Sequence, residues 1–375
     1  MMKNYIITVL KIALLLSLGS TAGRAQTITF DEMKNIFLHP NNYPNFITIG
    51  AHRGYWKDGP ENSLSAIRAA IALNVSMVEL DLKTTKDGVV VLAHDYDFGR
   101  LTTCPGRNNC QPGQFLIKNY TFNEIRNIYN IKLKDEFGNV TTEALPTLDE
   151  ALKEAKGRIL VDLDKVDLTI NVPKTGITET PFFDKVYAVI DANNMFDQVI
   201  VKGRAGGKPN IGAVSAWTPA ALRSKFPNID WKKLLFTPIY FADNGLPGHP
   251  DRRATQAEFV ASIKSFVDDA GFKVPGVELI YQDEDDKDSL RQAYTYVKTL
   301  GKQVIQFAAY PENQYGHWSP LDLTWKDQAL GTDHSINWDW LLTKPSHQPT
   351  LVITDRLEVL KQYLTLLGKQ NPTPK

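Results

Sequence analysis

Hydrophobic positions from residue 47 onward alternate between two patterns. Short runs typical of strands occupy eight segments: 47–51, 77–82, 158–164, 198–202, 235–240, 276–280, 303–307 and 350–354. Segments between them show helical spacing, as Leu64, Ile67 and Ile71 do, which gives a helix one apolar face. Eight alternations of strand and helix predict an α/β fold, a closed (β/α)8 TIM barrel rather than an open doubly wound sheet.

Start and stop signals support the predicted helices. Capping boxes, in which a Thr and the Glu three residues later satisfy each other's backbone N–H, occur at Thr121/Glu124, Thr147/Glu150 and Thr255/Glu258. Thr218-Pro219 supplies a cap followed by Pro at the first helical position. The last predicted helix runs from Arg356 to Leu367 and stops at Gly368.

Two segments interrupt the alternation. Residues 84–146 contain a Lys-Asp-Gly turn, the apolar run Val89–Ala93 and both cysteines, and residues 308–349 are rich in Trp, Pro and His. In a barrel we expect both as loop insertions over the C-terminal ends of the strands, where active sites of this fold form. No linker indicates a second domain, so residues 26–375 are expected to form a single barrel domain.

The first 25 residues are typical of a secretory signal peptide. Lys3 precedes an apolar stretch interrupted by Lys11, and small residues follow up to Ala25. The stretch is too short for a membrane span, and we expect cleavage before Gln26 and export to the periplasm or the medium. Cleavage lowers the basic residues from 42 to 39 against 42 acidic ones. That balance does not suit a nucleic-acid partner, and no stable membrane insertion is expected after cleavage.

Export changes the interpretation of the two cysteines. Cys104 and Cys110 flank a five-residue, loop-like stretch, and in an oxidising compartment such a pair favours a disulfide. Free thiols or half of a zinc site are the alternatives, but no further Cys exists and no His follows His94 nearby. A disulfide is therefore predicted.

Acidic residues on one predicted strand indicate a metal site. Glu79 and Asp81 point to the same face because side chains alternate along a strand. Two acids on one buried face need a compensating cation, and a hard ion with oxygen ligands, Ca²⁺ or Mg²⁺, suits them. Salt bridges to Arg53 or Lys83 are the alternative.

Basic residues at strand ends add acid/base and anion chemistry. His52 and Arg53 end the first strand, and His94 ends the run Val89–Ala93. Histidine moves protons near neutral pH, and the planar fork of arginine fits two phosphate oxygens. One strand-end His is more often structural than catalytic, but two beside an Arg and an acid pair favour a catalytic interpretation.

These residues together resemble the glycerophosphodiester phosphodiesterase family. The chain reads His52-Arg53-Gly54, Pro60-Glu61-Asn62-Ser63, Glu79-Leu80-Asp81, and Thr85-Lys86-Asp87-Gly88 leading to His94-Asp95. Weaker matches continue at residues 145–150 and 353–356. The resemblance implies a TIM barrel enzyme, a metal-dependent hydrolase that releases glycerol 3-phosphate and an alcohol. It also implies a general acid/base pair, His52 and His94, with Arg53 on the phosphate, Glu79 and Asp81 on the metal, and Glu61 at the metal or beside the catalytic groups.

The third metal ligand departs from the family's E-x-K pattern. The third strand carries Asp162 and Asp164 on one face, and we prefer Asp164 because it lies nearer the C-terminal rim. Lys165 then points away unless the strand ends there. Lys202 is a candidate phosphate or substrate contact, with a solvated lysine as the equal alternative.

Aromatic residues suggest where the rest of the substrate binds. Trp338 and Trp340 are candidates for its pocket, by cation–π contact or stacking, although packing is the stronger interpretation for most of the tryptophans near 318–340. His249, His317, His334 and His347 are expected at the surface, and Glu278 and Gln306 stay unassigned. Alternatives to the leading function are a phospholipase on inositol- or sphingo-phospholipids, a non-catalytic binding barrel, and a glycosidase.

Overall fold

Eight parallel strands close into a barrel. The computed structural model describes residues 28–57, 59–107, 110–111, 113–172, 177–205, 216–242, 246, 252–281, 284–308 and 338–375. The barrel strands are β1 (Thr48–His52), β2 (Met77–Thr84), β6 (Leu160–Asp164), β9 (Val199–Arg204), β10 (Leu235–Phe241), β11 (Gly276–Ile280), β12 (Gln303–Phe307) and β13 (Leu351–Thr354). Each pairs in parallel with the next, and pairing of β1 with both β2 and β13 closes the ring. The predicted TIM barrel is confirmed, strand by strand.

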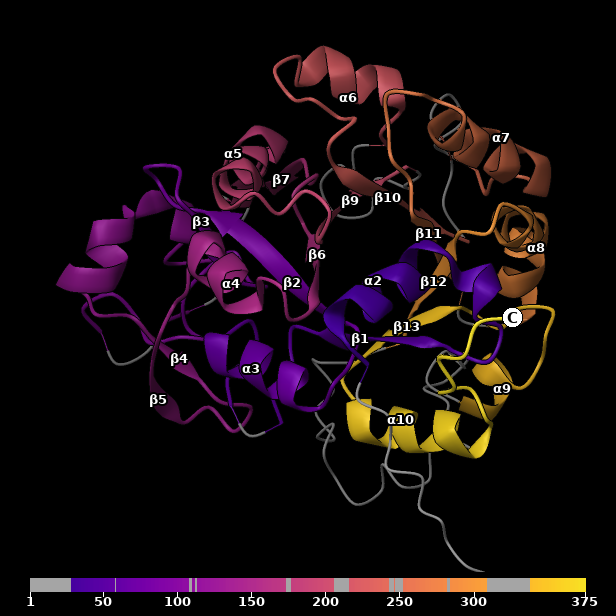
Figure 1. Ribbon diagram of the computed structural model, residues 1–375. Helices are drawn as coiled ribbons and strands as arrows, with labels where there is room; N and C mark the ends of the chain where they lie inside the picture. Colours follow the sequence, from indigo (N-terminus) through magenta and orange to yellow (C-terminus); the bar gives the residue numbers. More distant parts are fainter. Residues whose placement is uncertain are drawn as a thin grey trace, which may run out of the picture.

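Helices surround the ring of strands, as Figure 1 shows. They are α3 (Leu64–Ala72), α4 (Leu148–Ala155), α5 (Phe183–Asn193), α6 (Pro219–Lys225), α7 (Gln256–Val267), α8 (Glu284–Thr299), α9 (Trp338–Leu342) and α10 (Leu357–Leu366). The predicted caps at Thr147, Thr218 and Thr255 are confirmed at α4, α6 and α7. The Thr121/Glu124 pair is also formed, but it starts a π-helical turn, η3 (Glu124–Ile128).

Helix α2 (Phe30–Leu38) covers one end of the barrel and appears across the middle of the ring in Figure 1. Phe37 packs inside against an apolar layer that includes Met77, Leu160 and Ile200. The Gln303 side-chain amide donates to the Phe37 carbonyl at 2.9 Å. Because this apolar layer fills the base, the inward polar side chains of the same strands gather toward the opposite end, at the strand C-termini.

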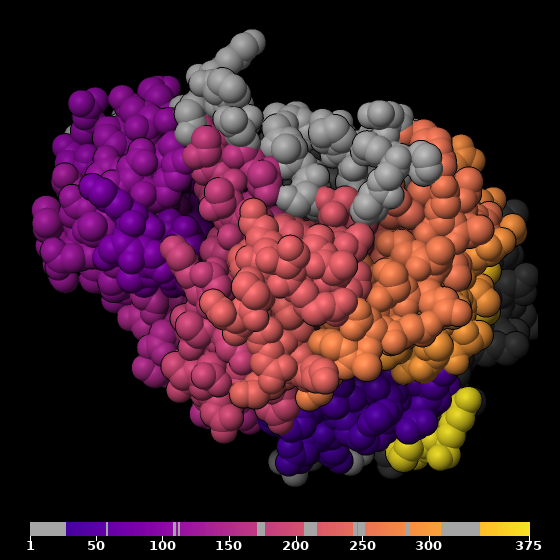
Figure 2. Space-filling model, turned by 90° about the horizontal axis from the view of Figure 1, so that it is seen from above, coloured from indigo at the N-terminus to yellow at the C-terminus, as the bar shows by residue number. Residues whose placement is uncertain are grey.

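The first insertion forms a lobe beside the barrel, the violet region at one side of Figure 2. It contains β3 (Val90–Leu92), η2 (Ile117–Asn119), η3, and the hairpin of β4 (Lys132–Lys134) and β5 (Val140–Ala144). The strand β3 pairs antiparallel with the end of β2, which joins the lobe to the barrel. Buried apolar side chains, Phe98 and Ile125 among them, give the lobe its own small core.

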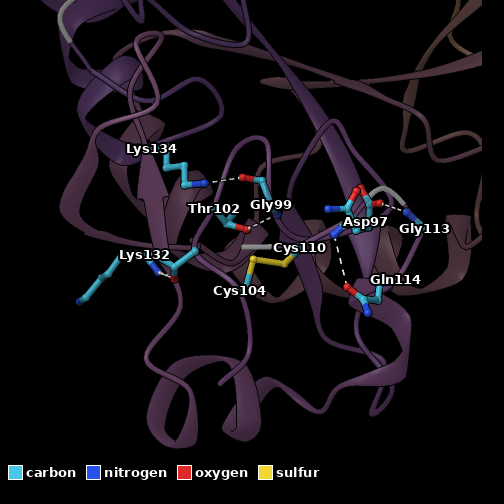
Figure 3. Close-up of a disulfide and its surroundings, with 11 residues drawn as sticks. Asp97, Gly99, Thr102, Cys104, Cys110, Gly113, Gln114, Lys132 and Lys134 are labelled. Carbon is cyan, nitrogen blue, oxygen red and sulfur yellow. Dashed lines mark hydrogen bonds between the residues drawn. A yellow bond between two sulfur atoms is a disulfide. The ribbon is translucent and has the colours of Figure 1, made fainter. Parts of the chain in front are cut away.

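The predicted disulfide between Cys104 and Cys110 is present in this lobe (Figure 3). A second, smaller excursion after β6 forms the hairpin of β7 (Ile170–Val172) and β8 (Ile177–Glu179). Lys118, in η2, donates from Nζ to the carbonyl of Thr178 at 2.9 Å, so the lobe and this hairpin are in contact.

The predicted insertion 308–349 contains more regular structure than its sequence suggested, since α9 lies inside it. Its residues 309–337 lie outside the described residues, as does the predicted signal peptide. Among the described helices, none combines the length and the apolar character that crossing a bilayer requires.

Candidate active site

His52 stands at the C-terminal end of β1, enclosed by the barrel. Its Nδ1 lies 3.0 Å from Asp355 Oδ1, and its Nε2 lies 3.8 Å from Glu79 Oε2. Asp355 also accepts from the Trp56 indole N–H at 3.0 Å, and the Phe307 ring meets the imidazole edge-on. A carboxylate only accepts hydrogen bonds, so Asp355 favours the tautomer with the proton on Nδ1. In this tautomer Nε2 is the ring nitrogen that carries the lone pair and can accept a proton.

The two residues after His52 turn the chain sharply. Arg53 has φ of +57° and Gly54 of +81°. A Cβ on Gly54 would lie 2.7 Å from Cβ of Ala66, so only glycine fits there. Among the described residues, Arg53 and Lys165 are the two with positive φ that are neither Gly nor Asn. Such backbone strain concentrates at functional sites, and here it aims both cations into the mouth of the barrel.

The Pro-Glu-Asn-Ser motif holds these groups in place. Glu61 accepts from Arg53 Nη1 at 2.8 Å. Asn62 donates from Nδ2 to Asp81 at 3.0 Å and accepts from the Asp81 backbone N–H at 2.9 Å. Ser63 caps α3. Three successive side chains of the motif therefore hold Arg53, Asp81 and the start of α3 in place. Glu61 binds Arg53 and is not one of the three convergent carboxylates described next.

Three carboxylates converge inside the mouth. One oxygen each from Glu79, Asp81 and Asp164 lies within 4.8 Å of the other two. The register of β2 and β6 explains this, because Asp81 stands opposite Asp164 while Glu79 stands opposite Asp162. Asp162, the other candidate for the third ligand, instead pairs with Lys202. An all-oxygen donor set of this kind fits a hard divalent cation.

Charges in the cluster are unevenly compensated. Burial, reinforced by the neighbouring Asp81, raises the pKa of Glu79 well above its ordinary value. Burial also acts to raise the pKa of Asp81, but the positive charges of Lys165, His94 and Arg53 outweigh it and hold that pKa well below its ordinary value. The expected alternative, a salt bridge from Arg53 to the acid pair, is present alongside the cluster, with Nε 3.2 Å from Asp81.

The strand β6 ends at Asp164, which settles where Lys165 points. Its backbone enters the left-handed region, with φ of +64°, and its Nζ returns to lie 3.3 Å from Asp81 Oδ1. Strict alternation would have turned this side chain away from the mouth. The chain thus keeps a lysine beside the carboxylates.

His94 enters the site from the lobe, directly after β3. Its Nδ1 lies 2.9 Å from Asp95 Oδ1, and Arg100 holds Asp95 through Nε and Nη2, both at 2.7 Å. Burial alone would raise the pKa of Asp95. The hydrogen bonds from His94 and Arg100 outweigh burial, and the net pKa lies below its ordinary value. Burial lowers the pKa of His94. Both site histidines therefore have a carboxylate on Nδ1.

Lys202 does not match either of its predicted roles in the described structure. Its side chain is 1% exposed, and its Nζ lies 2.8 Å from Asp162 and 2.8 Å from Glu278. The solvated alternative is wrong because the side chain points into the barrel. Its ammonium is committed to two carboxylates below the mouth, so a direct substrate contact is not supported. Burial acts to lower its pKa, but the two acids outweigh burial and raise it well above its ordinary value.

Arg204 was missed by sequence reasoning. It lies two residues beyond Lys202 on β9, and its Nη1 is 2.7 Å from Asp167 and 3.5 Å from Asp164. The same-face spacing of two basic residues at the end of a strand was the signal that could have found it.

The aromatic substrate-pocket prediction is wrong for Trp338. Its side chain, at the start of α9, is fully buried in the main hydrophobic core. Trp340 packs against Tyr281 and His347, with ring centroids 5.9 and 5.0 Å away. His347 is also buried, contrary to expectation, and its Nε2 lies 2.7 Å from the Trp340 carbonyl oxygen. The other loop residues of this set, Trp318, Trp325, His249, His317 and His334, lie outside the described residues.

Two known proteins are similar to this chain in sequence. The chain matches "Glycerophosphodiester phosphodiesterase 1" of Bos taurus at 41% identity over 28% of this chain and 29% of the relative. It matches "Glycerophosphodiester phosphodiesterase" of Caldanaerobacter subterraneus at 32% identity over 40% of this chain and 55% of the relative. The chain thus spans about half or less of these relatives.

A solved structure and a family model extend the comparison. A glycerophosphoryl diester phosphodiesterase structure from Parabacteroides distasonis superposes with a TM-score of 0.58, at 18% identity, over 92% of this chain and 94% of that one; this similarity shows the shared fold. The sequence model of the glycerophosphoryl diester phosphodiesterase family matches residues 52–224, from His52 past Arg204. These similarities indicate the glycerophosphoryl diester phosphodiesterase family for the matched part of the chain.

Proposed function

We propose that the chain is an exported glycerophosphodiester phosphodiesterase that releases glycerol 3-phosphate and an alcohol. The observation that carries the proposal is the pair of histidines, each with Nδ1 on a carboxylate, beside three convergent carboxylates at the mouth of the barrel. One histidine at Nε2 takes the proton of the attacking hydroxyl, which belongs to water or to the substrate's own glycerol. In the second case the attack forms a cyclic phosphate, and water then opens the ring to give glycerol 3-phosphate. The other gives a proton to the departing alcohol oxygen as the P–O bond breaks.

Negative charge on the phosphate calls for nearby cations. Arg53 and Lys165 both border Asp81 and supply fixed positive charge at the mouth. Glu79, Asp81 and Asp164 would hold a divalent cation, Ca²⁺ or Mg²⁺, which neutralises charge on the phosphate oxygens when it is bound. The raised pKa of Glu79 supports this assignment, because it marks a carboxylate that lacks compensating charge in the protein alone.

Location and substrate class belong to the same proposal. The signal-like residues 1–25 and the disulfide support export, since disulfides persist in oxidising compartments. A glycerophosphodiester is small and water-soluble, and an enzyme outside the cytoplasm meets it as a product of phospholipid breakdown.

Release of glycerol 3-phosphate from a panel of glycerophosphodiesters tests the activity. The panel carries choline, ethanolamine, serine, glycerol and inositol as the alcohol, and an inositol phospholipid serves as the competing substrate. Native protein is compared with chelated protein, with chelated protein given Ca²⁺ or Mg²⁺, and with His52→Ala.

We expect activity that disappears with the chelator, returns with one of the ions and is absent in the variant. A folded protein that leaves the whole panel intact with either ion would refute the proposed activity. Cleavage of the phospholipid alone would replace the substrate and keep the site.

A further inference from the structure

A continuous series of ion pairs links the strand end that carries His52 to the lobe that carries His94. Arg53 Nη1 lies 2.8 Å from Glu61 Oε1, and Glu61 Oε2 lies 3.5 Å from Arg100 Nη1. Arg100 continues to Asp95 with two contacts of 2.7 Å, and Asp95 Oδ1 lies 2.9 Å from His94 Nδ1. Arg100 joins the two halves of the series, because it contacts Glu61 on one side and Asp95 on the other.

The fork of Arg100 determines more than the charge of Asp95. Its Nε and Nη2 bind different oxygens of the carboxylate, which fixes the carboxylate plane. A fixed plane directs Oδ1 at His94 Nδ1 and so orients the imidazole. The side chains of His94 and Asp95 are partly exposed, so their orientation depends on such contacts more than that of the buried His52 does.

The disulfide sets the position of Arg100. Gly99, the residue before it, is packed against Cys110, because a Cβ on Gly99 would lie 3.0 Å from Cys110 Cβ (Figure 3). The Gly99 carbonyl accepts from Lys134 Nζ at 2.6 Å, and its N–H donates to the Thr102 hydroxyl at 3.3 Å. The backbone at Gly99 is thus held by the cystine and by the β4–β5 hairpin, in a stretch that has no helix or strand of its own.

We propose that Arg100 is a positioning residue that orients His94 through Asp95, and that the Cys104–Cys110 disulfide keeps Arg100 in place. The proposal rests on the proposed function for its consequence in turnover, but the orientation of His94 is a property of the folded protein alone. Reduction of the disulfide releases the loop and frees the fork, so the site is sensitive to the redox state of its surroundings.

Turnover variants test the first step. Arg100→Ala and Arg100→Lys lower kcat by about 10- to 100-fold, the usual cost of removing a group that orients a catalytic one, with KM within about 3-fold. Lysine retains the charge but not the fork, so it restores little. Arg252→Ala is the matched control: Arg252 also forms a two-point contact, with Glu258, and is similarly exposed, but it lies across the barrel on the segment before α7.

A double-variant cycle separates orientation from general stability. In the Asp95→Asn background, Arg100→Ala lowers kcat by less than about 3-fold further, because both changes remove the same contact. In the Arg100→Ala background, Cys104→Ser/Cys110→Ser costs little more, whereas in the native background it lowers kcat. Effects that multiply independently, or an Arg100→Ala variant within 2-fold of native kcat, overturn the proposal. A reduced protein that is folded and fully active overturns the role of the disulfide.

Side-chain ¹⁵N spectra of His94 test the orientation without turnover. The signal is assigned by its loss in His94→Gln, and native protein is expected to show the proton held on Nδ1. Arg100→Ala and reduction disturb this signal, whereas Arg252→Ala does not. If the His94 signal of Arg100→Ala equals that of native protein, the proposal is refuted, whether or not the protein has phosphodiesterase activity. If Arg100→Ala changes the signal but native protein has no activity, only the proposed function is refuted.

Discussion

The two histidines of the site are supported in opposite ways. His52 belongs to a barrel strand, is buried, and takes its carboxylate from Asp355, 303 residues away at the other side of the barrel closure. His94 belongs to the lobe, is partly exposed, and takes its carboxylate from the next residue, Asp95. The backbone hydrogen bonds of β1 to β2 and β13 hold His52 in position, whereas a few loop contacts hold His94. The orientation of His52 therefore depends on the barrel strands, whereas the orientation of His94 depends on a few side-chain contacts in the lobe.

Asp355→Asn is expected to cause the largest loss. The amide can donate to Nδ1, which favours the wrong tautomer of a buried ring that water cannot correct. We expect kcat to fall by about 10³-fold, within the range that general acid/base groups contribute. Steady-state kinetics with a thermal unfolding check decide the matter. A loss below 10-fold in folded protein would contradict the comparison.

Asp95→Asn should cost less, about 10- to 100-fold in kcat, because His94 is partly exposed and solvent can replace part of the lost contact. The two Asn variants are measured side by side under one set of conditions. Equal losses would mean that exposure of the second histidine gives it no tolerance.

Metal affinity should rise with pH in a way set by Glu79. Its pKa is raised by burial and by Asp81, so in metal-free protein Glu79 retains a proton above the usual pH range for a glutamate. A cation needs the ionised carboxylate, and binding therefore releases that proton. Below the raised pKa we expect about tenfold tighter binding per pH unit, measured by calorimetry in buffers of different ionisation enthalpy. Affinity independent of pH in that range would contradict the assignment of Glu79.

Lys83 offers the smallest and most local test, at the junction of barrel and lobe. Its Nζ donates to the carbonyls of Leu82 and Ala93, at 3.1 and 3.4 Å, just below His94. Burial, with a contribution from Lys165, lowers its pKa to about 7. Below that pH the folded and unfolded chains are both protonated there, and the folded state bears the cost of a buried charge.

Between the lowered pKa and the ordinary value of 10.5, the unfolded chain binds the extra proton, so stability rises with pH. We expect metal-free native protein to gain on the order of 1–3 kcal/mol in unfolding free energy from pH 7 to 9.5, relative to Lys83→Met. Denaturant titrations at several pH values measure this. Parallel curves for the two proteins would show that Lys83 keeps its ordinary titration.

The fold was predictable from sequence because each strand and helix start is a local signal. The Thr147 and Thr255 capping boxes and the eight apolar runs are each readable within a dozen residues. The same holds for the residues of the site that share short motifs, such as Glu61 and Asn62. The preference for Asp164 over Asp162 in the carboxylate cluster followed from strand alternation and distance to the rim alone.

What sequence could not supply was pairing across the barrel. Asp355 reaches His52, and Lys202 is enclosed between Asp162 and Glu278, because the ring closes, and no local pattern encodes which inward side chains meet. The error on Trp338 has the same origin. An aromatic residue in an irregular segment fits a pocket or a core equally well until the packing of α9 is known.

The helix that covers the base of the barrel has a practical consequence. Ile28 packs near Tyr43 and Phe46 beside α2, and Lys375 donates from its backbone N–H to the Asn42 carbonyl at 2.9 Å. Both ends of the described chain therefore emerge on the same side, opposite the face where the histidines stand. A protein immobilised on a bead through either end of the described chain would turn the face with the histidines away from the bead, and a peptide fused at either of these ends would lie on the opposite side from the histidines.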